Sequence, residues 1–146
     1  MKAFKNIIFL FTTLLIATPV LAADVVVVIV NSANTQQLSQ KDIKNIYSDN
    51  ITAWQSGTRI KLYNTPTNSY VREIFSQEIL ELSALQAAAT ESNKRITNTL
   101  KNPPDTKRER LIAASVAKKT NAIGYVSKEV ADKRSGIRVI FTITEE

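Results

Sequence analysis

The feature that most restricts the fold of this sequence is VVVVIV, an unbroken β-branched run from Val25 to Val30. A strand with one face in water alternates apolar and polar residues, whereas this run contains no polar position. The run therefore predicts a strand that is covered on both faces. Strands of this composition are typical of parallel sheets that carry helices on either side.

Helical and extended patterns alternate along the rest of the chain. Capping boxes, in which serine or threonine precedes an acidic residue or glutamine at the third position after it, begin at Ser39, Ser83 and Thr106. Each capping box predicts a helix that starts just after it. The expected strands lie at 25–30, 59–63, 122–126 and 137–143, and the expected helices begin near 40, 70, 84, 107 and 128.

The alternation of these elements predicts an α/β fold with a mostly parallel or mixed sheet flanked by helices. At 146 residues the chain has room for one such domain. Ligands of open α/β sheets bind beyond the carboxyl ends of the strands, where the following helices begin. We therefore expect a site among the loops that follow Val30, Tyr63 and Val126.

Residues 1–22 have the pattern of a secretory signal peptide. Lys2 and Lys5 give a positive start, an apolar run covers residues 7–17, and small residues end the segment at Ala22. The apolar run is about half as long as a helix that spans a bilayer. We expect cleavage after Ala22 and a single mature domain, residues 23–146, that is periplasmic or secreted and does not span the membrane. Retention of the segment as an anchor is the alternative.

The composition excludes several kinds of chemistry. Since the sequence has no cysteine and no histidine, it cannot form disulfides, the common zinc sites or a histidine-based catalytic centre. We expect no enzyme activity, no metal and no cofactor, with a serine–lysine dyad at Ser127 and Lys128, or at Ser39 and Lys41, as the catalytic alternative. Because the basic residues are mostly scattered, the net charge of +6 does not indicate a nucleic-acid partner.

Two motifs resemble those of a known family. IYSDNITAW (46–54) is similar to Ile-Phe-x-Gly-x-Ile-x-x-Trp in the substrate-binding proteins of phosphate ABC transporters, and NAIGYV (121–126) is similar to their Gly-Ala-Ile-Gly-Tyr-Val. NSYVREIF (68–75) occupies the place of the family helix that follows a Ser-Gly-Thr loop. The resemblance runs from about Val25 to Val139 and covers one lobe of the two-lobed proteins. It implies a single periplasmic-binding-protein-like lobe, as in the small PstS-like members.

The resemblance gives Trp54 a structural role. It implies that Trp54 closes the turn after the first helix and packs with Ile51 against the sheet. Asp49 stands where the family has glycine. Because aspartate tolerates left-handed backbone angles better than most residues, we expect the turn to be kept.

The family's ligand loop is altered in this chain. With Phe75 aligned to the family phenylalanine, Ser69 matches the first serine, whereas Tyr70 and Val71 replace the glycine and the threonine. The family arginine and aspartate fall on threonines. The candidate ligand-binding residues are the remaining hydrogen-bonding side chains before the helix, Thr65, Thr67, Asn68 and Ser69. The alternative is that Ser69 simply caps its helix.

A second anion site is predicted at DTKRER (105–110). Lys107 and Arg108 fall in the first turn of the expected helix, where a positive charge opposes the helix dipole. A bound anion or an acidic partner would offset that effect. Asp105 and Glu109 would do so in the alternative interpretation.

Two function classes follow. The first is an exported solute-binding-like domain that holds phosphate or a related small oxyanion at helix N-termini, with an ABC transporter component as the implied partner. The second is a ligandless interaction or accessory module of the same fold, with another cell-envelope protein as its partner. Whether a second chain or a dimer supplies the other lobe is left open.

Overall fold

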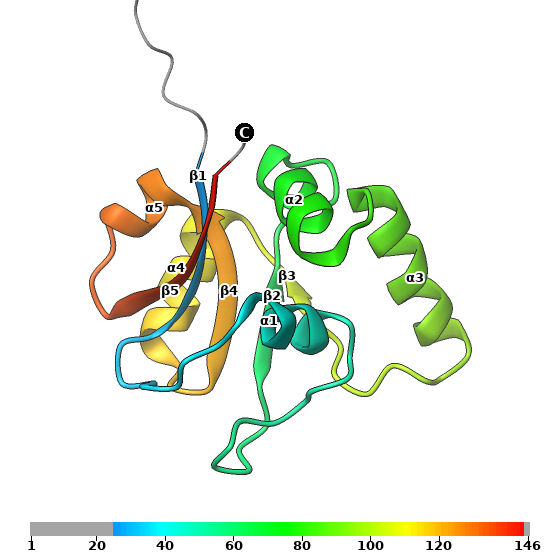
Figure 1. Cartoon of the computed structure of the whole chain (residues 1–146), viewed down its shortest axis with the longest axis horizontal. Helices are drawn as coiled ribbons and strands as arrows, with labels where there is room; N and C mark the ends of the chain where they lie inside the picture. The colour runs from blue at the N-terminus through cyan, green and yellow to red at the C-terminus, as the bar shows by residue number, and fades with distance from the viewer. Residues whose placement is uncertain (1–24, 145–146) are drawn as a thin grey trace, which may run out of the picture.

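A five-stranded mixed sheet organises residues 25–144, the part of the chain that the structure, a computed structural model, describes (Figure 1). The predicted signal peptide lies outside the described residues. The strands are β1 (Val25–Asn31), β2 (Lys61–Asn64), β3 (Asp105–Thr106), β4 (Ala122–Ser127) and β5 (Ile137–Thr144), in the sheet order β3-β2-β4-β1-β5. The helices are α1 (Gln40–Tyr47), α2 (Tyr70–Phe75), α3 (Ala84–Ile96), α4 (Glu109–Lys118) and α5 (Lys128–Asp132), with a π-helical segment, η1 (Ser76–Leu80), directly after α2.

Strand β1 is buried on both faces, as its composition predicts. Val26, Val28 and Val30 pack with the side chains of α1, α2 and η1, whereas Val27 and Ile29 pack with those of α4 and α5. Figure 1 shows these two groups of helices on opposite sides of the sheet. The prediction of a sheet flanked by helices is therefore confirmed.

The direction of β1 differs from the expectation of a mostly parallel sheet. Strands β2, β3 and β4 are parallel, but β1 runs antiparallel to both of its neighbours, β4 and β5. The sheet is mixed, which was the other form that the sequence predicted. Burial on both faces explains the apolar run equally well in either direction, so composition alone does not determine strand direction.

The reversed strand moves one of the three predicted site loops. Val26 pairs with Ser127, and Val30 pairs with Ile123. The carboxyl end of β1 consequently lies at the edge where β4 begins, opposite the carboxyl ends of β2 and β4. The prediction that the loop after Val30 joins the site is wrong, while the loops after β2 and β4 do leave from one edge.

Two of the three predicted capping boxes are present. Ser39 caps α1 with Asp42, and Ser83 caps α3 with Gln86. Thr106 does not open a helix, because it belongs to β3 and pairs with Asn64 of β2. Helix α4 instead begins at Glu109. The backbone at residues 105–106 forms the edge strand of the sheet. Pairing with β2 therefore prevails over the capping-box pattern, which predicted a helix from this point.

The turn after α1 has the expected form. Trp54 is 7% exposed within the core, and its indole Nε1 donates a hydrogen bond to the Asn121 carbonyl at 2.9 Å. Asp49 has a left-handed backbone, with φ of 68°. Its carboxylate also accepts hydrogen bonds from the backbone N–H groups of Lys101 at 2.7 Å and Asn102 at 2.8 Å. The aspartate therefore joins the turn to the segment before β3.

An aromatic cluster joins α1 and α2 to β4. The rings of Phe75 and Tyr125 are stacked with centroids 3.8 Å apart, and Tyr47 meets both of them edge-on. The cluster fixes α2 over the sheet and positions the loop that leads into it. Among the helices of residues 25–144, none has the length and apolarity that crossing a bilayer requires.

Candidate functional site

The loop between β2 and α2, residues 65–69, leaves the carboxyl edge of the sheet. Its first residue, Thr65, is fully buried. The backbone N–H and the hydroxyl of Thr65 both donate to the Tyr125 hydroxyl, at 3.2 and 3.3 Å. Tyr125 in turn donates to Asn64 Oδ1 at 3.0 Å. Thr65, a predicted ligand residue, is thus used inside the protein and anchors the loop to β4.

Ser69 is the N-cap of α2, as the alternative interpretation of its role predicts. Its hydroxyl oxygen accepts the backbone N–H of Arg72 at 3.1 Å and donates to Thr65 Oγ1 at 3.1 Å. The hydroxyl is therefore engaged on both sides, which orders the loop but leaves it little capacity for a ligand. Val71, which replaces the family threonine, is buried in the core.

The outer side of the loop keeps unused hydrogen-bond donors. Thr67 is partly exposed and Asn68 is exposed, and neither side chain has a hydrogen-bond partner within residues 25–144. In the same part of the chain, no acceptor is present for the backbone N–H groups of Thr67, Asn68 and Val71. The first N–H groups of a helix lack partners and carry partial positive charge. This side of the loop can accept a negatively charged group.

Lys107 and Arg108 do not occupy the first turn of α4. Arg108 is the N-cap residue, and the backbone N–H of Lys107 donates to the Asn64 carbonyl at 2.9 Å. The Lys107 ammonium lies 5.7 Å from the centroid of the Tyr63 ring. Since Tyr63 packs with Ile112 of α4, this cation is on the face of the sheet opposite α2. The two predicted anion sites are therefore separate.

The Lys107 site already contains an acidic partner. Asp105 forms an ion pair with Lys61 at 2.7 Å. The hydrogen bond from Lys61 lowers the pKa of Asp105, and the charges of Lys107 and Lys119 act in the same direction. Lys61, Lys107 and Lys119 all lie within 5.9 Å of the Tyr63 ring centroid. Asp105 therefore supplies part of the negative charge beside Lys107, for which the sequence predicted either acidic side chains of the same segment or a bound anion as the source.

The sequence did not predict the burial of Arg72, which is the most deeply buried charged residue beside the loop. Its side chain is 4% exposed, and Nη1 donates to the Thr65 carbonyl at 3.2 Å. In YVREIF (70–75), Arg72 and Glu73 both stand among apolar residues, so the local sequence does not mark which charged side chain is buried. Arg72 therefore holds the buried start of the loop through the Thr65 carbonyl.

Metal chemistry has no visible centre in the described chain. Within residues 25–144, no group of three or more aspartate or glutamate side chains is placed to hold a metal ion. The arrangement at the carboxyl edge consists of hydrogen-bond donors on an ordered loop, which suits binding of an anion.

Comparisons with known proteins agree with this architecture. A family model described as a PBP superfamily domain matches residues 13–140. No curated protein matches the chain. Solved structures with a similar fold include an ABC-type phosphate transport receptor from Vibrio cholerae, with a TM-score of 0.62 at 20% identity over 82% of this chain and 46% of that one.

Two further solved structures share the fold. A candidate phosphate-binding protein from Planctomyces limnophilus DSM 3776 has a TM-score of 0.59 at 16% identity, over 82% of this chain and 41% of that one. A candidate phosphate ABC transporter substrate-binding protein from Clostridium perfringens, with bound phosphate, has a TM-score of 0.56 at 20% identity, over 86% and 57%. The chain thus spans about half the length of the solved structures that it matches.

Proposed function

The chain belongs to the PBP superfamily, and from that premise we propose that it is an exported solute-binding lobe for phosphate or a related small oxyanion. The observation that carries the proposal is the outer side of the loop between β2 and α2. There the backbone N–H groups of Thr67, Asn68 and Val71 have no acceptor within residues 25–144. This loop lies at the carboxyl edge of the sheet, where open α/β folds bind ligands, which supports the proposal.

We expect this site to be weak. The residues aligned with the family arginine and aspartate are Thr65 and Thr67, so the loop has no cationic side chain of its own. The helix dipole and neutral donors are then the main attraction, and a dipole contributes about 0.3–1 kcal/mol. A dissociation constant of about 1 mM or weaker is consistent with so few charge-assisted bonds.

A complete clamshell would need a second lobe. This chain spans about half the length of the matched structures, which include a phosphate transport receptor and a candidate phosphate ABC transporter substrate-binding protein. We propose that the exported protein acts in the periplasm or outside the cell, without enzyme activity, and meets an ABC transporter component. A second copy of the chain or that partner would close the site from the other side.

Phosphate titration of the exported protein, followed by backbone amide NMR, tests the proposal. We expect saturable shifts at Thr67, Asn68 and Val71 with phosphate or sulfate, and none with chloride at the same ionic strength. At ten times the dissociation constant, the ligand should raise the free energy of unfolding by about 1.4 kcal/mol. Uniform, non-saturating shifts would count against a site.

A pair of threonine variants locates the binding. Thr67→Val removes one hydroxyl from the loop, so we expect at least a threefold loss of phosphate affinity. Thr120→Val is the matched control, since Thr120 is exposed and precedes β4 at the opposite edge of the sheet. Equal affinity of the two variants would move the site away from this loop.

The second candidate function is a ligandless envelope module. The observation in its favour is that Ser69 donates a hydrogen bond to Thr65, and Thr65 donates to Tyr125. The hydroxyls on the inner side of the loop are therefore hydrogen-bonded without a ligand. Such a module would show no saturable response to oxyanions. It would instead be recovered with a specific envelope protein after cross-linking in intact cells.

A further inference from the structure

A pocket on the same side of the sheet as α2 is lined by the end of α1, by β2, by α2 and by α3. Its volume is about 90 Å³, and its polar and charged lining includes Arg72, Asn64 and Glu91. Leu62, Leu82 and Ala87 are among the apolar side chains of its wall. A single buried water needs only about 10–15 Å³ by this kind of measure, so the pocket has room for a ligand larger than one water.

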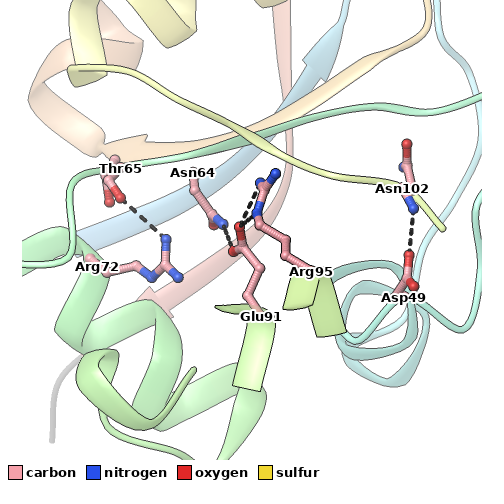
Figure 2. A network of polar contacts seen from close by, with 7 residues as sticks. All are labelled: Asp49, Asn64, Thr65, Arg72, Glu91, Arg95 and Asn102. Atoms are coloured by element: carbon pink, nitrogen blue, oxygen red, sulfur yellow. Dashed lines mark hydrogen bonds and ion pairs between the residues drawn. The ribbon is translucent and has the colours of Figure 1, made fainter. Parts of the chain in front are cut away.

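Arg72 brings a positive charge to this pocket without a counter-charge. No carboxylate of residues 25–144 lies within ion-pair distance of its guanidinium, and its buried Nε has no hydrogen-bond partner there. Figure 2 shows the guanidinium directed towards Asn64 and Glu91, with a hydrogen bond to Thr65 on its other side. An arginine does not deprotonate in proteins, and a buried charge is costly unless it is paired.

The neighbouring phenols do not neutralise Arg72. Burial raises the pKa of Tyr125 and, more strongly, that of Tyr47. Both phenols therefore stay uncharged at neutral pH. The Tyr47 hydroxyl, moreover, donates to the Tyr63 carbonyl at 3.0 Å.

The other charged groups of the pocket already have partners. Glu91 accepts hydrogen bonds from Arg95 at 2.9 Å and, weakly, from Asn64 at 3.5 Å. Lys94 donates to the Ser48 carbonyl at 2.8 Å. The Asp49 carboxylate is held by two backbone N–H groups. The guanidinium is thus the charged group whose hydrogen bonding is least complete.

We propose that this pocket binds a small organic carboxylate, whose oxygens accept hydrogen bonds from the guanidinium of Arg72 while its short apolar chain lies against Leu82 and Ala87. A carboxylate supplies one negative charge and the planar geometry that matches a guanidinium. The apolar wall favours a ligand with a hydrocarbon part. The Glu91 carboxylate repels a phosphate dianion more strongly than a carboxylate with a single charge, and phosphate gains nothing from the apolar wall. This site does not depend on the oxyanion site proposed above.

The pocket volume sets the size of the probes. At about 10–15 Å³ for each water by the same measure, about 90 Å³ is several times the room that one water needs, which suits small acids from acetate to butyrate. The exported protein, labelled with ¹⁵N, would be titrated with acetate, propionate and butyrate, and separately with phosphate and chloride at equal ionic strength. The Arg72 Nε–H is the reporter, because a buried N–H exchanges slowly enough to be observed.

We expect the Nε–H resonance of Arg72 to move and saturate with the carboxylates, with at least threefold tighter binding of butyrate than of acetate. Arg72→Lys should weaken all three acids at least tenfold. Ala87→Leu should fill the apolar end and weaken butyrate at least fivefold more than acetate. Ala89→Leu is its matched control, because Ala89 lies on the exposed side of the same helix.

The Ala87 pair keeps the test decisive if Arg72→Lys fails to fold. No saturable shift with any acid at 100 mM would overturn the proposal, as would equal behaviour of Ala87→Leu and Ala89→Leu. Phosphate that moves the Arg72 resonance with the affinity of butyrate would also overturn it. Failure of the oxyanion site is recognised separately, because that site is read from the amide of Asn68 on the outer loop.

Discussion

Replacement of Asp49 should separate the two roles that one residue has in the turn after α1. The carboxylate accepts two backbone N–H groups, from Lys101 and Asn102, and the backbone is left-handed. Loss of the acceptor leaves those donors without their partner, at about 1–3 kcal/mol each. Lys101 is exposed and can turn to water, whereas Asn102 is buried, so we expect about 2–4 kcal/mol from the hydrogen bonds together.

The left-handed backbone adds a second term that depends on the substituted residue. Alanine at a φ of 68° costs about 1–2 kcal/mol, whereas glycine adopts this conformation freely. Asp49→Ala should therefore destabilise the fold by about 3–6 kcal/mol, and Asp49→Gly by about 2–4. Asp49→Asn keeps one acceptor oxygen and a tolerated backbone, so we expect about 1–2 kcal/mol.

Urea unfolding followed by fluorescence measures these differences directly, because Trp54 is the only tryptophan and is buried near the turn. The expected order of stability is wild type, Asn, Gly and then Ala. An Asp49→Gly protein as stable as the wild type would show that the carboxylate contributes nothing. Equal stability of the Gly and Ala proteins would refute the backbone part of the reasoning.

Three further substitutions test the packing and the charges. Gly124→Ala should cost about 1–3 kcal/mol in urea unfolding, because its new Cβ would lie 2.5 Å from Ile112 Cγ2; a loss below 0.5 would contradict the packing. Gly57→Ala adds a Cβ with no atom within 4 Å, so only its φ of 85° matters, and we expect about 1–2 kcal/mol. The hydrogen bond from Lys61 holds the pKa of Asp105 below its usual 3.8, so its stabilisation is complete above that pH and is lost as the pH falls through the lowered pKa. Asp105→Asn should therefore remove part of the loss in unfolding free energy at low pH, at most about 1 kcal/mol because the ion pair is half exposed. Identical plots of unfolding free energy against pH for the two proteins would contradict this prediction.

Local signals in the sequence predicted much of the fold. The serines that cap α1 and α3 lie within three residues of their partners, so the pattern is complete in a short segment. The left-handed backbone of Asp49 was likewise expected from one position. The direction of β1 was not, because its apolar residues record burial and not the direction of the neighbouring strands. Because β1 runs antiparallel to β4, the loop after β1 lies at the opposite edge of the sheet from the loops after β2 and β4.

The segment 105–109 shows how a local pattern loses to a distant partner. Thr106 and Glu109 have the spacing of a capping box, yet Thr106 pairs with Asn64 in the sheet. Glu109 instead accepts the backbone N–H of Ser127. Both contacts join residues far apart in the sequence, so no short window contains them. Lys107 is consequently beside Tyr63 and not in a helical turn.

Arg72 marks the same limit at the candidate ligand sites. Val71, Ile74 and Phe75 define one apolar face of a helix, and a position off that face, such as 72, would ordinarily be in solvent. The inference assumes that the other side of the helix is wet. Here α3, which begins only at Ala84, lines the same pocket as Arg72 and encloses the charge. A pocket that encloses a charge depends on segments that are distant in the sequence, whereas the hydrogen-bond donors of loop 65–69 lie in one short segment and can be recognised from it. The family resemblance therefore pointed to the loop, although the larger electrostatic imbalance lies behind it.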